Sequence, residues 1–152
     1  MEFIDFLDRK EIEILRIVDK AGYKIEENTA LCLKSKNYVG FLIKKKKKII
    51  ICTDNAKNRE NYRINDIRRE FTFERTALHI KKAIRHEAVH VAQECNKGNL
   101  LNIDRKLSMN PSKIKALNGS IRISGEEEKE RQAYILEDKP RLVKNELLKY
   151  CL

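Results

Sequence analysis

The feature that most constrains this chain is a helical pattern in its second half. Between Arg75 and about Asn96, apolar residues recur at spacings of three and four, as they do on a helix with one buried face. The residues of this stripe are Ile80, Ile84, Ala88, Val91 and Cys95. Gly98 follows as a typical helix stop. The pattern predicts a long helix over residues 75–96.

Shorter patterns flank this helix on both sides. Further helices are predicted over residues 8–21, 111–117, 126–138 and 140–148. Three β-like runs, 30–33, 38–43 and 48–53, are separated by polar turn residues and predict a small antiparallel meander. Residues 58–73 are polar with scattered apolar positions, so a short helix there stays open. Residues 99–110 are predicted to form a loop, and 121–123 a short bridge.

Length and composition favour one folded unit. The chain has 152 residues, only two prolines and five glycines, and no repeat or linker-like stretch. A chain of this size can bury a core without disulfides or metals as staples. We therefore predict a single α+β domain over residues 1–152.

Charge and cysteine usage narrow the class of protein. The net charge is +10, and no apolar run approaches the ~20 residues that cross a membrane. Glu2 and Asp5 stand where a secretory signal carries basic residues, so no export signal is predicted. The four cysteines, which form no C-x-x-C pair, are Cys32, Cys52, Cys95 and Cys151. We expect them to be reduced and mostly buried, in a cytoplasmic protein.

The long helix carries the motif H-E-x-x-H at residues 86–90. Residues four apart on a helix lie one turn above each other, so His86 and His90 leave the same face. Two imidazole nitrogens placed this way can both bind one zinc ion. Glu87 points about 100° away on an ideal helix, where its carboxylate can reach a water on the metal without binding the metal.

A third ligand has to come from elsewhere in the chain. His79 lies two turns before His86, roughly 10 Å along the axis, which is too far to share an ion. A carboxylate of the predicted helix 126–138 is the better candidate. The acids there are Glu126, Glu127, Glu128, Glu130, Glu137 and Asp138.

At this point residues 75–138 resemble the gluzincin-type zinc metallopeptidases. That family combines H-E-x-x-H with a downstream glutamate, often in the pattern E-x-x-A, which Glu130–Ala133 matches. The resemblance implies that Glu130 is the third ligand, with Glu127 one turn earlier as the alternative. It also implies a minimal zincin-like core, in which an edge strand, either 38–43 or 48–53, borders the cleft.

The function implied is a zinc-dependent peptide-bond hydrolase with one Zn²⁺ per chain. His86, His90 and Glu130 would bind the metal, and Glu87 would act as general base toward a metal-activated water. Tyr134 either stabilises the oxyanion or packs between helices. Gln93 either orients a metal ligand or is an ordinary polar surface residue. The expected substrate is a peptide or protein, acidic or extended.

Two other readings stay open. Lys44–Lys48 is a run of five lysines, which suits a solvated hairpin turn or a contact for anions. A basic nucleic-acid- or protein-binding module is therefore one alternative, although no nucleic-acid motif is present. A zincin-like domain without peptidase activity is the other. The sequence does not fix the oligomeric state.

Overall fold

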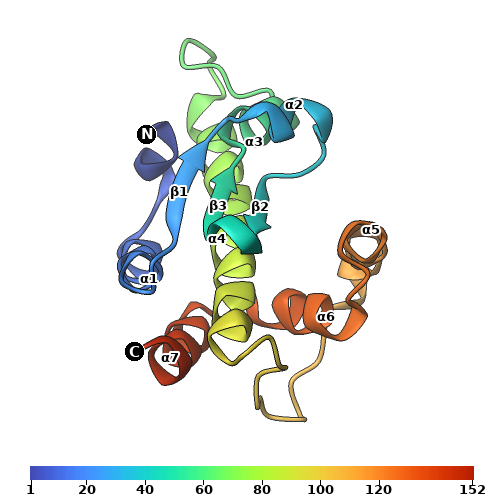
Figure 1. Ribbon diagram of the computed structural model, residues 1–152. Helices are drawn as coiled ribbons and strands as arrows, with labels where there is room; N and C mark the ends of the chain where they lie inside the picture. The colour runs from blue at the N-terminus through green and yellow to red at the C-terminus, as the bar shows by residue number, and fades with distance from the viewer.

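The computed structural model describes all 152 residues and confirms the α+β class (Figure 1). Strands occur only in the first half of the chain, and the second half is helical. The elements are η1 (Glu2–Phe6), α1 (Arg9–Lys20), β1 (Lys24–Glu27), α2 (Ala30–Lys34), β2 (Gly40–Ile43), η2 (Lys44–Lys46), β3 (Lys48–Ile51), α3 (Thr53–Arg59), α4 (Arg69–Cys95), η3 (Pro111–Lys113), α5 (Ile114–Ser124), α6 (Glu127–Leu136) and α7 (Pro140–Cys151).

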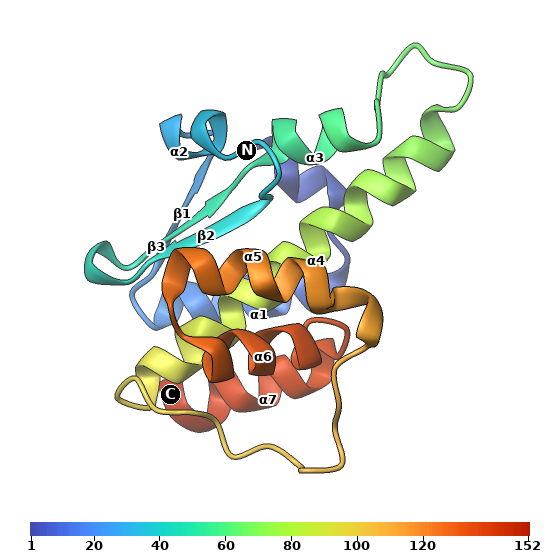
Figure 2. The same ribbon diagram turned by 90° about the vertical axis from the view of Figure 1, so that its right-hand side faces the viewer.

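Helix α4 is the centre of the fold. It contains the predicted long helix and begins six residues earlier, at Arg69. The sheet, α1, α6 and α7 all pack against it, as Figures 1 and 2 show from two sides. Residues 84–93 are consequently all buried, on every face of the helix. The main hydrophobic core extends around this segment from Phe3 in η1 to Leu147 in α7.

The sheet differs from the predicted meander. Its strand order is β1-β3-β2, with β1 parallel and β2 antiparallel to the central β3. Residues 30–33, predicted as a strand, belong to helix α2, because a four-residue apolar run does not distinguish the two structures. Strand β1 was missed because its sequence, Lys-Ile-Glu-Glu, has one strand-favouring residue and none of its residues is fully buried.

Helix α5 is longer than predicted. It runs through Gly119 to Ser124, so residues 121–123 are helical rather than a bridge. Gly125 ends α5 with φ at 71°, a left-handed conformation that glycine adopts without strain. The loop predicted over 99–110 is confirmed, and the undecided segment 58–73 contains the end of α3 and the start of α4. None of the helices is both long and apolar enough to cross a membrane.

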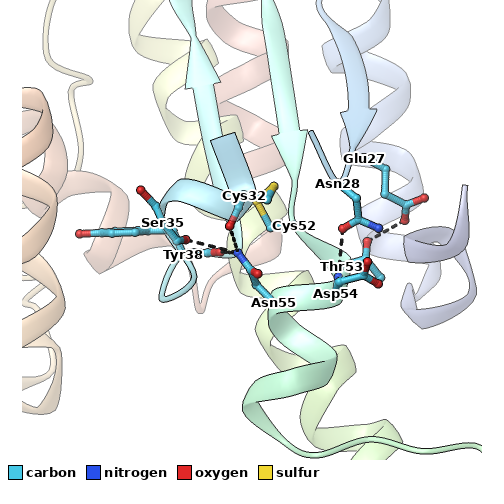
Figure 3. Close-up of a disulfide and its surroundings, with 9 residues drawn as sticks. All are labelled: Glu27, Asn28, Cys32, Ser35, Tyr38, Cys52, Thr53, Asp54 and Asn55. Atoms are coloured by element: carbon cyan, nitrogen blue, oxygen red, sulfur yellow. Dashed lines mark hydrogen bonds between the residues drawn. A yellow bond between two sulfur atoms is a disulfide. The ribbon is translucent and has the colours of Figure 1, made fainter. Parts of the chain in front are cut away.

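The cysteines form two disulfides, Cys32–Cys52 and Cys95–Cys151, which contradicts the expectation of reduced thiols. The first bond joins α2 to the residue that follows β3 (Figure 3). The second joins the C-terminal ends of α4 and α7. The partners are 20 and 56 residues apart in sequence, and no local pattern indicates which cysteines meet.

Asn55 of α3 fixes the segment that leads into β2. Its side-chain nitrogen lies 3.0 Å from the carbonyl oxygen of Cys32, 3.3 Å from that of Ser35 and 2.9 Å from that of Tyr38 (Figure 3). Together with the adjacent disulfide, this side chain holds the entrance to β2 against the rest of the sheet.

Candidate metal centre

Helix α4 places His86 and His90 side by side. The two rings have centroids 5.0 Å apart and are inclined at 74°. Both side chains belong to the fully buried segment of the helix, with 8% and 7% of their surface exposed. The helical geometry expected from the H-E-x-x-H spacing is therefore present, in surroundings from which most water is excluded.

Helix α6 brings Glu130 against the same two rings. One carboxylate oxygen lies 2.8 Å from His90 Nε2, and the other lies 3.3 Å from His86 Nε2. One ligand atom from each of the three residues lies within 4.8 Å of the other two. Ala133, one turn beyond Glu130, is completely buried, which lets α6 approach α4 closely. The structure thus brings together His86, His90 and Glu130.

The outer nitrogen of His86 faces a second carboxylate. His86 Nδ1 lies 3.1 Å from Glu137 Oε2, and the other oxygen of Glu137 lies 2.9 Å from Lys113 Nζ. A hydrogen bond from Nδ1 to a carboxylate orients the ring and leaves Nε2 to face Glu130. Lys113, which is itself buried, forms an ion pair with Glu137 beside the histidine.

Gln93 orients His90 in a similar way. Its amide nitrogen donates hydrogen bonds to the carbonyl of Lys129 and to Gln132 Oε1, at 3.1 and 3.0 Å. Its amide oxygen is therefore the acceptor for His90 Nδ1, at 2.8 Å. His90 Nδ1 is thus bonded to Gln93, and Nε2 faces Glu130. This is the orienting role that the sequence left open for Gln93.

The site attracts positive charge. His90 Nε2 is buried without a hydrogen-bond partner, because its contact with Glu130 lacks hydrogen-bonding geometry. Burial alone would lower the pKa of His86, but hydrogen bonds to Glu130 and Glu137 outweigh it and raise that pKa to about 10. Burial opposes ionisation of Glu130, yet the nearby His86 and His90 hold its pKa well below the usual range. Two imidazoles and one carboxylate are also a frequent donor set of catalytic zinc sites, so these residues fit a divalent cation.

Glu87 lies beside the three residues and borders a cleft of about 1320 Å³. Its burial raises the pKa of its carboxyl group, which the nearby His86 and His90 counteract. Gly40 of β2 passes directly over it, since a Cβ at that glycine would lie 3.2 Å from Glu87 Cγ and 3.2 Å from Ala83 Cβ. The absence of a side chain at Gly40 therefore allows β2 to run next to Glu87.

The cleft lies between β2 and α5. Tyr38–Leu42 line one side, and residues of α5 line the other. Because β3 is the central strand, β2 is the edge strand at this cleft, which answers the choice that the sequence left between 38–43 and 48–53. The cleft is larger than the ~300–1,000 Å³ usual for small-molecule pockets.

Other candidates take different positions. Glu127 is exposed and pairs with Arg131 at 3.0 Å, so it is not a ligand in this arrangement. His79 lies 3.7 Å from Glu60 and does not belong to the group of His86, His90 and Glu130. The ring of Tyr134 contacts His86 at a centroid distance of 4.4 Å, but its hydroxyl bonds to Ser120 Oγ at 2.6 Å and Ala116 O at 3.1 Å in α5. This contact matches the alternative of a tyrosine packed between helices.

Sequence reasoning missed the roles of Glu137 and Lys113. Glu137 stands seven residues after Glu130, the spacing of one helix face, and this signal could have selected it among the six acids. No comparable signal exists for Lys113, whose side chain reaches Glu137 from η3 only through the tertiary fold.

No curated protein and no solved structure matches this chain. A family model described as a domain of unknown function, DUF8637, matches residues 3–152, which is nearly the whole chain. The chain therefore belongs to the DUF8637 family.

Proposed function

We propose that this protein is a zinc-dependent peptidase with a zincin-like core. The observation that carries the proposal is the convergence of His86, His90 and Glu130 next to Glu87 on an edge-strand cleft. A histidine pair alone would be satisfied by ordinary hydrogen bonds. Here the outer nitrogens are already bonded to Glu137 and Gln93, and both inner nitrogens face the Glu130 carboxylate, with His90 Nε2 buried without a hydrogen-bond partner.

The donor set favours zinc. Imidazole and carboxylate ligands suit Zn²⁺, and three protein ligands are the usual number where water or substrate takes the fourth position. When bound, zinc would lower the pKa of a water molecule and polarise the carbonyl group of a peptide. The hydrogen bonds that Glu137 and Gln93 accept from the two rings hold them in the orientation that such binding needs.

Glu87 is assigned the role of general base. It does not belong to the ligand trio, yet it faces the same cleft. Burial raises the pKa of its carboxyl group, which makes the carboxylate a stronger base. It can then accept a proton from water and later deliver that proton to the leaving amine.

The edge strand favours a peptide as substrate. The outer side of β2 has no strand partner, so its backbone groups can pair with an extended chain lying in the cleft. Such a chain would pass next to Gly40 and therefore next to Glu87. This placement would bring a backbone amide of the bound chain close to the general base.

The proposal is tested by metal content and peptide hydrolysis. We expect about one zinc per chain in protein purified without chelators or nickel resin, lost in His86→Ala and retained in Glu87→Gln. Hydrolysis of a mixed peptide library, followed by mass spectrometry, should occur with the wild type and stop in both variants. His79→Ala, which removes a histidine outside the trio, is the matched control for metal content and should keep its zinc.

Three results would decide against it. Full activity of Glu87→Gln would remove the general base. Zinc binding without hydrolysis by the wild type would indicate a zincin-like domain without peptidase activity. Lack of zinc, combined with DNA binding that weakens steeply with salt, would indicate a basic nucleic-acid-binding module.

The sequence predicts a cytoplasmic location, and this stays a prediction. The two disulfides favour an oxidising compartment instead, because such bonds are rare where thiols are kept reduced. Alkylation of free thiols in cells at the moment of lysis measures the redox state of the four cysteines directly. Four alkylated thiols per chain would support a cytoplasmic location. The absence of any alkylated thiol would contradict that location.

A further inference from the structure

We infer that the cleft takes an acidic polypeptide segment, with acidic side chains on both sides of the bond that is cut. This inference rests on the proposed peptidase function and adds the class of substrate. It starts from the charges that line the two walls of the cleft.

Three cationic side chains line the cleft without a carboxylate partner: Arg59, Lys115 and Arg122. The other cations of the walls are engaged. Lys44 pairs with Glu126 at 2.8 Å, and Lys82 lies 3.7 Å from Asp138. The positive charge of the three free residues is therefore available to a ligand.

The walls offer almost no competing negative charge. Apart from Glu87, Glu130 and Glu137 at the centre, the one acidic residue lining the cleft is Glu126. Its charge is already balanced by Lys44 and by Lys129 at 3.1 Å. An incoming carboxylate would meet cations on the walls and no free acid there.

The free cations lie toward opposite ends of the cleft. Arg59 donates a hydrogen bond to the carbonyl of Asn37, at 3.1 Å, shortly before β2 begins. The pair between Lys44 and Glu126 joins the end of β2 to the residues that follow α5, so Arg122 lies toward that other end. Glu87, which contacts Gly40 at the start of β2, lies between them along the cleft.

The face of α5 that lines the cleft has a regular pattern. Lys115, Asn118, Gly119 and Arg122 are spaced at three and four residues and all line the cleft. Lys115 and Arg122 are two turns, or about 10 Å, apart, which corresponds to about three residues of an extended chain. Side chains alternate along an extended chain, so acidic residues two or four positions apart lie on one face and can reach the two long cationic side chains together.

A polypeptide matches this cleft better than a nucleic acid does. The unpaired edge of β2 offers backbone hydrogen bonds that a peptide can complete and a phosphodiester chain cannot. Ile114 and Ile123, at the two ends of α5, are 51% and 60% exposed and also line the cleft. Apolar contacts of this kind suit side chains rather than phosphates.

The test compares cleavage-site preferences. The zinc-loaded wild type is given a proteome-derived peptide library, and we expect cleaved sites to be enriched in Asp and Glu on both sides of the bond. Arg122→Glu and Lys115→Glu should each lower kcat/KM for an acidic peptide about tenfold, because each places a like charge opposite the substrate. Lys10→Glu, an exposed α1 position outside the cleft, makes the same change in net charge and should have no effect.

A binding measurement separates this inference from the proposed function. Fluorescein-labelled acidic, neutral and basic peptides of equal length are titrated with zinc-loaded Glu87→Gln. Tighter binding of the acidic peptide, lost in the added Arg122→Glu change, supports the inference even if no turnover occurs. Cleavage or binding without acidic preference overturns it and leaves the peptidase intact. Preference for single-stranded DNA over every peptide overturns it in favour of a nucleic acid.

Discussion

The His86 ring is held between two carboxylates of one short segment: Nε2 lies 3.3 Å from Glu130 Oε2 and Nδ1 lies 3.1 Å from Glu137 Oε2. Glu137 stands at the end of α6, seven residues beyond Glu130. The two acids therefore have different tasks. Glu130 faces the proposed metal position, and Glu137 fixes the ring from behind.

Glu137→Gln should weaken zinc binding about 10–100-fold, the range found when an outer partner of a metal-binding histidine is altered. The amide keeps an acceptor for His86 Nδ1 but removes the charge that supports the imidazole. Competition with a chromophoric chelator measures the affinity. Glu128→Gln, an exposed position on α6, is the control. Equal affinities for wild type and Glu137→Gln would show that Glu137 serves only to neutralise Lys113.

Glu27 is predicted to make stability depend on acid. Its carboxylate accepts hydrogen bonds from the backbone of Glu2 and Phe3, at 3.0 and 2.7 Å, and from Thr53 Oγ1 at 2.6 Å (Figure 3 shows the bond to Thr53). Burial alone would raise the pKa of Glu27, but these bonds lower it below 4.5. A lowered pKa stabilises the folded state above about pH 4.5, and that stabilisation is lost as the pH falls further.

Glu27→Gln should therefore reduce the free energy of unfolding by about 2 kcal/mol at pH 7, the scale of hydrogen bonds to a charged group. At pH 3 the gap between wild type and variant should be smaller. Urea unfolding at pH 7, 5 and 3 measures the difference in the free energy of unfolding between wild type and variant. Glu128→Gln is the reference for the loss of one negative charge. A gap that stays constant with pH would show that the charge of Glu27 is unimportant.

Gly119 and Tyr38 are predicted to be coupled across the cleft. A Cβ at Gly119 would lie 2.9 Å from the Tyr38 hydroxyl oxygen, closer than such contacts allow. Gly119→Ala should gain about 1 kcal/mol of helix propensity but lose part of it to this clash. In a Tyr38→Phe background the oxygen is gone, and the full gain should appear. A double-mutant cycle by urea unfolding measures the difference, and strict additivity would contradict the contact.

The disulfides are predicted to contribute unequally to stability. In the chain-entropy model, a link between cysteines 56 residues apart contributes about 4 kcal/mol, and one between cysteines 20 apart about 3 kcal/mol. Cys95→Ala with Cys151→Ala should therefore destabilise more than Cys32→Ala with Cys52→Ala. Thermal unfolding of oxidised protein ranks the two, and a thiol assay under denaturing conditions should find no free cysteine in the wild type. Four free thiols would rule out both bonds.

Local patterns predicted the parts of this molecule that depend on one helix. The long helix α4 follows from apolar spacing, and the shared face of His86 and His90 follows from helical geometry alone. The choice of Glu130 required the resemblance to gluzincins, since the acids of this region look alike in sequence. The structure separates them by position: Glu130 faces α4, whereas Glu127 is solvent-exposed.

The parts that were not predicted depend on contacts between distant segments. Strand β1 exists because Ile25 and its neighbours pair with β3, and nothing in its own four residues requires it. The same holds for the disulfides and for Lys113 beside Glu137, which join elements that a single pass along the chain does not connect.

Helix α5 contributes little to the core of the fold. Among the helices it packs mainly against α6, and only Leu117 and Ser120 of its 11 residues are buried. Helix α4, by contrast, contributes to the core and holds His86 and His90 with the same buried segment. Substitutions on the exposed face of α5 can therefore reshape one wall of the cleft without disturbing the buried segment of α4 that holds His86 and His90.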